Sequence, residues 1–494
     1  MSREQEIRSN RIEKKKRIEE AGMEAYATST KQGITLGELK KTFATLYKKN
    51  KDTKYRIVGR IMSQRGSGKI SFVSLFDGTD SFQVVFRVDD LGKEKMQFFT
   101  KNFDIGDFVE VHGYLGKTKS KAQSLFVTKY SMLTKALLPL PDAHYGLVDE
   151  ELKYRKRYLD ALLDQEVRKR FVLRAQVIKT IREFLNDKGL LEVETPILQS
   201  QAGGAMAEVF DTHHKDFDQN MHLRIALELD HKMMMIAGYP GVYEIGKCFR
   251  NEGSDPTHHQ EFTMLEWYAA YQDLKTNMRW MQELIKKLAK LTGEKEFIVY
   301  DNQGLGTSIS FGGKWPVVSF RDLVKKYAKL DIHKADRKTI ESKALEYGMT
   351  KKEIKIKGDA NLLDFIYKKS ARSKIINPTF VVGYPSDLIP LAQKNDDGTA
   401  DMYQLVVGGA EVVKSFNELV DPLLQRELLE RQSHFKTQGD HEAMEIDERF
   451  LEAMEYGMPP MTGCGMGIDR LMAILCSRKN LKDVIFFPLM KDAK

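Results

Sequence analysis

The pattern of apolar and polar positions changes twice along the chain. Residues 1–54 place apolar side chains at helical spacing among many charged ones, which predicts an N-terminal helical extension. Over residues 55–137, apolar and polar positions alternate in runs that Gly and Asp turns separate, and this pattern predicts strands. The five runs are YRIVGRIMS, KISFVSLFD, SFQVVFRV, DFVEVHGYLG and SLFVTKYSML. Five strands of this length predict a small closed β-barrel.

A second domain is predicted over residues 153–494. Pro139 and Pro141 fit neither a helix nor a strand, so residues 138–152 are interpreted as a linker. A long amphipathic helix is expected from about Leu152 to Lys188, and runs such as GVYEIGKCF, EFTMLEWYAAY and MYQLVVGG predict an antiparallel or mixed sheet flanked by helices. The polar, lysine-rich stretch at about 300–375 predicts a helical insertion. The predicted fold class is therefore α+β, with an N-terminal barrel followed along the chain by a sheet domain.

The composition is that of a globular protein, because hydrophobic residues make up 42% and charged residues 30% of the 494 positions. No apolar run approaches the roughly 20 residues that cross a bilayer, and the N-terminus is charged where a signal peptide is apolar. The three cysteines fit neither a disulfide framework nor a zinc site. A cytoplasmic protein without a membrane segment is expected. The basic run at residues 14–17 suits either a solvated helix face or a contact with nucleic-acid phosphates.

The predicted barrel resembles the oligonucleotide-binding (OB) fold, whose exposed strand face stacks aromatic side chains on bases. Phe72 and Gln83 are the first candidates for such contacts. A phenylalanine in a strand is also a common core residue, so a core position for Phe72 stays open.

A strand, loop and strand in the second domain bring charged residues together. An apolar strand ends at Arg250, a loop covers residues 253–260, and the return strand begins EFTMLE. Because alternate side chains share one face of a strand, Arg250 and Glu252 are expected to converge on one pocket with Phe262 and Glu266. Activation of a carboxylate by ATP needs such cations around the α-phosphate and a platform for adenine. An Arg-Asn-Glu triplet alone would fit a surface ion pair better.

Near the C-terminus, GCGMGIDRL alternates three glycines and then begins an apolar helix around Asp469. Glycines let the backbone approach a ligand closely, and Arg470 at the helix start faces the same ligand in this arrangement. The spacing differs from the dinucleotide-binding fingerprint, and a tight turn explains a GxGxG string equally well when it stands alone.

Together these motifs resemble the class II lysyl-tRNA synthetases, from the barrel to the C-terminus. GLLEVETPIL, with Pro196, looks like the first signature of that family, which forms the dimer interface. YEIGKCFRNEG through EFTMLEWYAAY looks like the second signature, and GCGMGIDRL like the third. The resemblance implies an OB barrel that binds the anticodon, followed by a class II catalytic domain built on an antiparallel sheet.

The resemblance also implies residue roles. The catalytic residues would be Arg250, Glu252 and Arg470, where Arg250 bridges the α-phosphate and the substrate carboxylate and Arg470 holds the γ-phosphate. The other expected ATP contacts are His258, Phe262 and Glu411, with Phe262 stacked on adenine. Glu411 would bind Mg²⁺, and Gln404 replaces the second acid of that pair. The expected anticodon contacts are Arg65, Phe72 and Gln83.

A substrate with an ammonium group should meet buried carboxylates, because an unpaired buried cation is costly. Glu228, Glu266 and Glu418 match the lysine-binding acids of the family, whereas an aspartate-specific relative would need cations there. Lys414 stands where an asparagine is usual, so it either assists the substrate carboxylate or weakens lysine binding. The expected lysine site comprises Gly204, Glu228, Arg250, Glu266, Tyr268, Lys414 and Glu418.

The implied function is that of a homodimeric lysine–tRNA ligase, which uses ATP, L-lysine and tRNA(Lys) with Mg²⁺ as cofactor. Two alternatives stay open. An aspartyl- or asparaginyl-tRNA synthetase shares the barrel and the signatures, although Glu266 and Glu418 speak against it. A catalytically inactive tRNA-binding paralogue is the other, and the presence of Arg250, Glu252 and Arg470 speaks against it.

Overall fold

The computed structural model describes residues 2–31, 33–49, 53–66, 68–141, 147–201, 203–205, 207–301, 303–437 and 446–492. The chain divides into two compact units, which we call the barrel unit (Met1–Lys153 and Tyr158–Leu163) and the sheet unit (Tyr154–Arg157 and Asp164–Lys494). Residues 142–146 of the expected linker lie outside the described residues.

Five strands form a closed barrel, as the alternating pattern predicts, and their order is β1-β2-β3-β5-β4. Alternate residues of β1, β2 and β4 are buried, because one face of each strand lines the barrel core and the other faces outward. The strands are β1 (Lys54–Arg65), β2 (Ile70–Phe76), β3 (Ser81–Arg87), β4 (Phe108–Lys117) and β5 (Gln123–Thr134).

Two N-terminal helices, α1 (Arg3–Glu20) and α2 (Leu36–Lys49), pack on this barrel. Ile18, Leu39 and Phe43 are buried in the same core cluster as the strands, so these helices are part of the barrel unit's core. Two further helices, α3 (Val88–Leu91) and α4 (Lys93–Asn102), lie between β3 and β4, where the sequence pattern predicts none.

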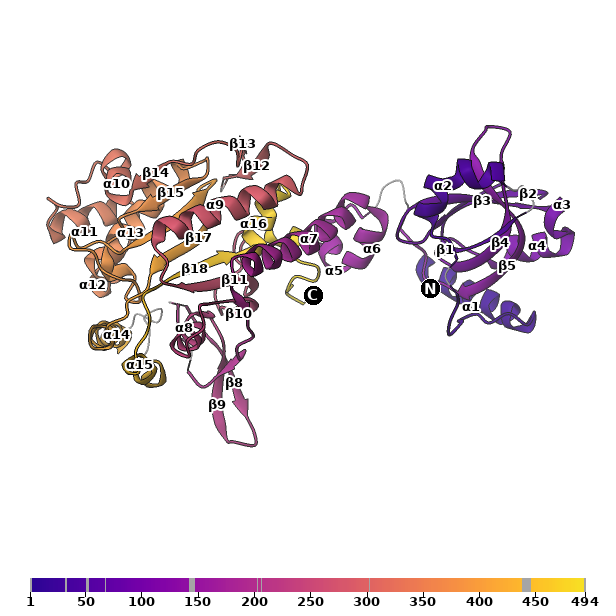
Figure 1. The fold of residues 1–494 in the computed structure, drawn as a ribbon. Coiled ribbons are helices and arrows are strands. Elements are labelled where there is room, and N and C mark those ends of the chain that lie inside the picture. The colour runs from indigo at the N-terminus through magenta and orange to yellow at the C-terminus, as the bar shows by residue number, and fades with distance from the viewer. Residues whose placement is uncertain are drawn as a thin grey trace. The chain divides into compact units, whose positions relative to one another are not determined.

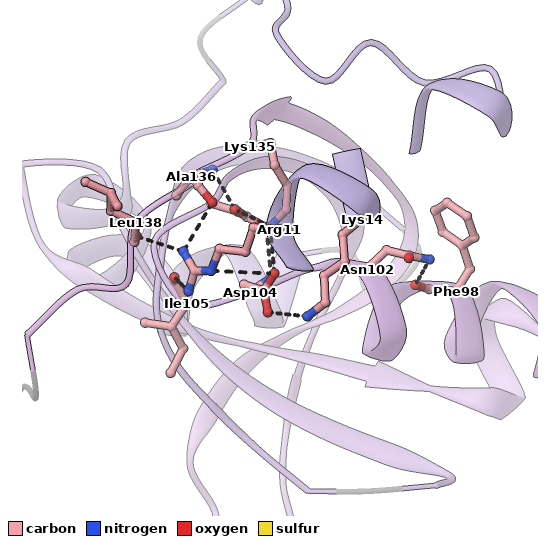
Figure 2. Close-up of polar contacts among 10 residues, drawn as sticks. Arg11, Lys14, Phe98, Asn102, Asp104, Ile105, Lys135, Ala136 and Leu138 are labelled. Carbon is pink, nitrogen blue, oxygen red and sulfur yellow. Dashed lines mark hydrogen bonds and ion pairs between the residues drawn. The ribbon is translucent and has the colours of Figure 1, made fainter. Parts of the chain in front are cut away.

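The basic run at residues 14–17 is largely paired within the barrel unit. Figure 2 shows Lys14 and Lys135 on either side of Asp104, with Nζ–carboxylate distances of 2.6 and 2.7 Å. The Arg11 guanidinium, one turn earlier, donates to the backbone carbonyls of Ile105, Ala136 and Leu138. Lys15 and Lys16 pair along the helix with glutamates at i+4 and i−3. Lys14 therefore fastens α1 to the barrel, a role that neither hypothesis for the run anticipated.

The long helix expected between about Leu152 and Lys188 is wrong as a single element. The structure has three helices there, α5 (Glu150–Arg155), α6 (Arg157–Leu163) and α7 (Gln165–Asp187). The Asp164 carboxylate accepts from the backbone N–H of Glu166 and so caps α7. An N-cap residue has non-helical backbone angles, which explains the break at this position.

An eight-stranded sheet, ordered β14-β15-β16-β17-β18-β11-β10-β6, forms the sheet unit. Neighbouring strands are antiparallel except for the pairs β14–β15 and β10–β6. This arrangement confirms the predicted antiparallel or mixed sheet. Its strands are β6 (Leu191–Glu192), β10 (Gly241–Phe249), β11 (Glu261–Ala270), β14 (Val317–Ser319), β15 (Thr379–Val382), β16 (Met402–Val407), β17 (Ala410–Asn417) and β18 (Met461–Gly467).

Helices cover both faces of this sheet (Figure 1). One face packs against α7, α9 (Leu274–Lys290) and α16 (Ile468–Leu475), and its buried core includes Leu265, Trp267 and Met466. The other face contributes Val242, Val406 and Phe416 to a second core, shared with α8 (Glu228–Ile236), α15 (Glu448–Glu455) and the helices of the insertion. The face shared with α8 and the insertion carries the site described below.

The insertion contains short strands as well as the predicted helices. Its helices α10 (Phe320–Ala328), α11 (Arg337–Glu346), α12 (Lys351–Ile356) and α13 (Asp359–Ser370) follow strands β12 (Phe297–Tyr300), β13 (Gly306–Ile309) and β14. A hairpin that projects from the sheet unit is made by β8 and β9 (Figure 1). The remaining elements are β7 (Leu198–Gln199), β8 (Phe210–His214), β9 (Gln219–Leu223), α14 (Pro422–Thr437) and the 3-10 helices Arg372–Lys374, Ser386–Leu388 and Leu481–Val484.

None of the helices in the described ranges is both long and apolar enough to span a bilayer.

Candidate active site

Strand β18 forms the floor of a cavity of about 390 Å³ in the sheet unit. Gly463, Cys464, Gly465 and Gly467 line this cavity, and the side chains of Cys464 and Met466 are buried in the core on the opposite face of the sheet. Alternation along the strand thus places the three glycines of the GxGxG string on one face. On this face the strand carries no side chains at the three glycines, so a ligand can contact its backbone.

Strands β11 and β17 form the walls on either side of this floor. Their alternate side chains line the cavity, so the sharing of one face predicted from the sequence is found in the structure. The lining residues of β11 are Phe262, Met264, Glu266 and Tyr268, with Thr263 beside them, and those of β17 are Glu411, Lys414 and Phe416, with Val412 beside them.

The register of these strands divides the cavity into successive rows. Gly463 lies between Phe416 and Tyr268, and Gly465 lies between Lys414 and Glu266. Gly467 pairs with Met264, one row further on. We call the end with Glu228, Glu266 and Tyr268 the acidic end, and the end with Arg250, Phe262 and Arg470 the basic end.

Two arginines and an aromatic ring define the basic end. Arg250 follows β10, and its guanidinium carbon lies 5.1 Å from the centre of the Phe262 ring, within the range of a cation–π contact. Its Nη2 donates to the carbonyl of Ile225 at 3.4 Å. Arg470 lies in the first turn of α16 and donates to the backbone carbonyl of Glu411. Burial lowers the pKa of Arg470, yet a guanidinium remains charged at any physiological pH.

The loop at 253–260 lies at the mouth of the basic end. Glu252 and His258 are exposed there, and the His258 ring nitrogen Nδ1 lies 2.9 Å from the Asp255 carboxylate. The C-terminal segment holds the loop, because Nε2 of His259 accepts from the backbone N–H of Leu489 at 3.0 Å. Burial lowers the pKa of His259 and so favours the neutral ring that this bond requires.

Asp469 fixes the strand and helix that carry the basic end. Its Oδ2 accepts from the backbone N–H of Thr263 at 2.7 Å, and its Oδ1 lies 2.6 Å from the guanidinium of Arg174. The carboxylate therefore ties the start of α16, and with it Arg470, to β11 and α7. This role was missed in the sequence, where Asp469 only marks the start of a helix.

Glu266 is the buried centre of the acidic end. Its two carboxylate oxygens accept from the backbone N–H of Leu227 at 3.4 Å and from the hydroxyl of Tyr268 at 3.2 Å. Burial raises the pKa of Glu266 to about 7, and the negative charge of nearby Glu228 adds to this shift. The side chain is therefore poised between its charged and neutral forms near neutral pH.

A buried lysine joins the other two acids. Nζ of Lys232 lies 2.6 Å from Glu228 Oε1 and 2.5 Å from Glu418 Oε2, and its side chain is fully buried. Glu418 itself does not line the cavity, although its Oε1 has no hydrogen-bond partner among the described residues. That oxygen lies 2.0 Å from the position that a Cβ on Gly463 would occupy, so it lies over the same face of the glycine strand as Tyr268.

The expected magnesium pair does not form at the cavity. Glu411 lines the cavity, but Gln404 does not. Gln404 is buried, and its Oε1 accepts from the hydroxyl of Tyr384 at 2.7 Å. Within the described residues, no group of three or more His, Cys, Asp or Glu side chains is arranged to hold a metal ion.

The structure brings most of the expected residues of the sheet unit to this one cavity and leaves Gln404 and Glu418 outside its lining. Those that line it are Gly204, Glu228, Arg250, Glu252, His258, Phe262, Glu266, Tyr268, Glu411, Lys414 and Arg470. Sequence reasoning missed Lys232 and Lys368, the latter reaching the cavity from α13 of the insertion. The spacing of Glu228 and Lys232, four apart on a helix, could have indicated the first pair. No sequence signal indicated Lys368.

The three barrel candidates lie on neighbouring strands of the barrel unit. Arg65 and Phe72 are directly opposite each other on β1 and β2, and Gln83 on β3 donates to the hydroxyl of Ser124 at 2.7 Å. Phe72 is half-buried and lies outside the barrel core, whose β2 members are Val73 and Leu75. The core position considered for Phe72 is therefore wrong.

Comparison with known proteins places the chain in a family. The lysine–tRNA ligase of Dehalococcoides mccartyi is 38% identical over 500 aligned residues, covering 99% of this chain and 98% of the relative. The enzymes of the same name from Clostridium acetobutylicum and Clostridium perfringens are 40% and 39% identical, covering 90% and 89% of this chain and 86% and 87% of theirs. Residues 55–133 match the OB-fold nucleic acid binding domain. Residues 149–491 match the family described as tRNA synthetases class II (D, K and N), and the chain belongs to this family.

Proposed function

We propose that this enzyme is a lysine–tRNA ligase, which activates L-lysine with ATP and transfers it to the 3′ end of tRNA(Lys). One observation carries the choice of substrate. A single cavity holds buried carboxylates at one end and two arginines beside an aromatic ring at the other. The first end suits an ammonium group and the second suits a nucleotide.

The acidic end supports lysine as the amino acid. Glu228 and Glu266 line the cavity, and the unpartnered Oε1 of Glu418 lies over Gly463, on the same face of the strand as Tyr268. Lys232 offsets one of the three acids, so the remaining negative charge leaves room for a second ammonium group. Gly204 lies close against Glu228, since a Cβ there would lie 2.9 Å from the Glu228 Cβ. Among the described residues that line this end, an aspartate or asparagine side chain would find no cation, and nearby Lys232 is already paired.

The chemistry follows from this orientation. With its side chain at the acidic end, lysine presents its α-carboxylate to the middle of the cavity, near Arg250. ATP then stacks adenine on Phe262 and directs its phosphates toward Arg470, with Glu252 and His258 at the mouth. A carboxylate oxygen forms a bond to the α-phosphorus while the bond to pyrophosphate breaks, and pyrophosphate leaves with the electron pair. The arginines stabilise the extra negative charge of this step. A ribose hydroxyl of tRNA next attacks the carbonyl carbon, and AMP leaves.

Magnesium accompanies ATP, but the side chains here do not fit a protein-held pair of carboxylate ligands. A hard cation prefers charged oxygens. Position 404 offers only an amide, whose oxygen is already occupied by Tyr384. Glu411 is left as the one candidate ligand of the expected pair.

The barrel supports tRNA binding. Arg65, Phe72 and Gln83 face outward on three adjacent strands, where a ring that stacks on a base and polar groups that contact base edges serve together. We propose that these residues contact the anticodon.

The first signature supports a homodimer. Strand β6 lies at the edge of the eight-stranded sheet, and Leu191, Ile197 and Leu198 around Pro196 are 47%, 43% and 46% exposed. Exposed apolar side chains on an edge strand and in the segment that follows it suit an interface with a second copy. The three cysteines are free thiols, which suits our proposal of a cytoplasmic location.

Amino-acid-dependent exchange of pyrophosphate into ATP tests the assignment. We expect exchange with L-lysine and none with aspartate or asparagine, followed by charging of tRNA(Lys). Exchange driven by another amino acid would refute the lysine assignment. Binding of tRNA without any exchange would favour the inactive tRNA-binding paralogue instead.

A further inference from the structure

Lys414 lies where the two ends of the cavity meet. It is directly opposite Gly465 on β18, and Gly465 is opposite Glu266 on β11. The row of Phe416 and Tyr268 lies on its acidic side, and the row of Gly467 and Met264 lies on its basic side. Two strand spacings of about 4.8 Å separate Lys414 from Glu266, with only a glycine between them. Under the proposed function, the substrate carboxylate and the α-phosphate of ATP meet at this level.

The Lys414 side chain has no hydrogen-bond or ion-pair partner among the described residues, although it is half-buried. The two other lysines near the cavity are both paired. Lys232 contacts Glu228 and Glu418, and Nζ of Lys368 lies 2.7 Å from Asp364. A cation held in a cavity without a partner is costly, so the position suits an anionic ligand that completes the pair.

Gln404 explains why this ammonium group is unpaired. It lies directly opposite Lys414 on β16, so a carboxylate at position 404 would be placed to neutralise Lys414. The amide has no charge, and its oxygen is occupied by Tyr384. Because Gln404 is neutral where a carboxylate would pair with Lys414, the positive charge of Lys414 remains uncompensated in this row of the cavity.

We propose that Lys414 is a catalytic residue of lysine activation, and that its ammonium group stabilises the negative charge that develops at the α-phosphate. The inference rests on the proposed function and extends it. When the carboxylate oxygen bonds to the α-phosphorus and pyrophosphate departs, Lys414 donates a hydrogen bond to a phosphate oxygen and transfers no proton. The protein thereby supplies positive charge at the place where two carboxylates would otherwise recruit a divalent cation.

Lys414→Met tests this inference, because it keeps the length of the side chain and removes its charge. We expect kcat for lysine-dependent pyrophosphate exchange to fall about 100-fold or more, while the KM for lysine changes less than about threefold. Calorimetric titration of ATP alone should show nearly unchanged affinity, since the charge acts in the transition state. Lys247→Met is the matched control, because Lys247 is a half-buried lysine of β10 that pairs with Glu261 outside the cavity.

The double variant Gln404→Glu with Lys414→Asn tests the exchange of a protein cation for a metal ion. We expect it to recover activity relative to Lys414→Met only at raised Mg²⁺, with a steeper dependence on free Mg²⁺ than wild type.

A Lys414→Met enzyme with kcat within threefold of wild type would overturn the inference. So would a large rise in the KM for lysine at unchanged kcat, which would make Lys414 a binding residue only. If wild type exchanges with another amino acid, the lysine assignment fails and the Lys414 variants are compared with that amino acid.

Discussion

The two ends of the cavity are built in opposite ways. At the acidic end the charged groups are buried and already contact one another, as Lys232 does with Glu228 and Glu418. At the basic end the groups lie on an exposed loop, above a glycine strand, and on the first turn of a helix. The acidic end is preorganised before substrate arrives, whereas the basic end leaves open space for a large, charged ligand.

Because of this difference, the acidic end selects the amino acid and the basic end carries the reaction with ATP. A buried set of charges that the right ligand completes discriminates strongly, because a wrong side chain leaves buried groups unpaired. The arginines of the other end contact a ligand that every member of the family shares, so they contribute to the rate. Substitutions at the two ends should therefore affect different kinetic constants.

The largest effect is expected from Arg250→Ala at the basic end. Removal of one cation from a charge-stabilising site costs about 10²–10³ in kcat, and Arg250 is proposed to contact both reactants, so the upper figure is expected. Pyrophosphate exchange at saturating lysine and ATP measures it. Arg250→Lys should recover only part of the rate, because an ammonium lacks the planar fork of a guanidinium. Arg279→Ala, an exposed arginine on α9, is the control. Full activity in Arg250→Ala would remove Arg250 from the site.

Glu266→Gln should weaken the binding of lysine at the acidic end. It keeps the shape of the side chain and removes its charge, so we expect the KM for lysine to rise about 100-fold, as for loss of a buried charged contact of about 3 kcal/mol. The KM for ATP should stay within about twofold. Glu261→Gln on the same strand is the control, since Glu261 is exposed and pairs with Lys247 outside the cavity. Equal rises in both KM values would show that the ends are not independent.

The sequence predicted the basic end better than the acidic end. Arg250, Phe262 and Arg470 stand in contiguous motifs, so strand alternation and a helix start suffice to bring them to one pocket. The pairing of Lys232 with Glu418 joins residues far apart in the chain, and only the packing of α8 against the sheet shows it. Lys368 depends on how the insertion folds over the same face. Gln404 was expected at the cavity because of its place in the motif, but Tyr384, a residue distant in sequence, holds it elsewhere.

Gly463→Ala tests whether the Glu418 carboxylate contributes to lysine binding. The added Cβ would lie 2.0 Å from Glu418 Oε1 and 2.5 Å from Cε1 of Tyr268, so both side chains must shift. We expect about a tenfold rise in the KM for lysine with little change for ATP. Gly253→Ala provides the contrast at the basic end, because nothing lies within 4 Å of a Cβ there. An unchanged KM for lysine would exclude the Glu418 oxygen from substrate binding.

The smallest effect is a dependence of lysine affinity on pH. Burial, and then the charge of Glu228, raises the pKa of Glu266 to about 7, so a large part of the free enzyme carries a proton on Glu266 at neutral pH. The Leu227 N–H and the Tyr268 hydroxyl donate to the same carboxylate, and the charge of Arg250 acts against the shift. An ammonium ligand binds the ionised form, so it must displace that proton.

Affinity for lysine should therefore be constant above this pKa and fall as the pH drops below it, by up to about tenfold per pH unit. Calorimetric titration of lysine without ATP measures the acidic end alone, and repeating it in buffers of different ionisation enthalpy counts the proton released. In Glu266→Gln the slope should disappear, because the amide does not titrate. The same slope in that variant would assign the proton to Glu418, whose pKa burial also raises, and the acidic end would then titrate as a coupled cluster.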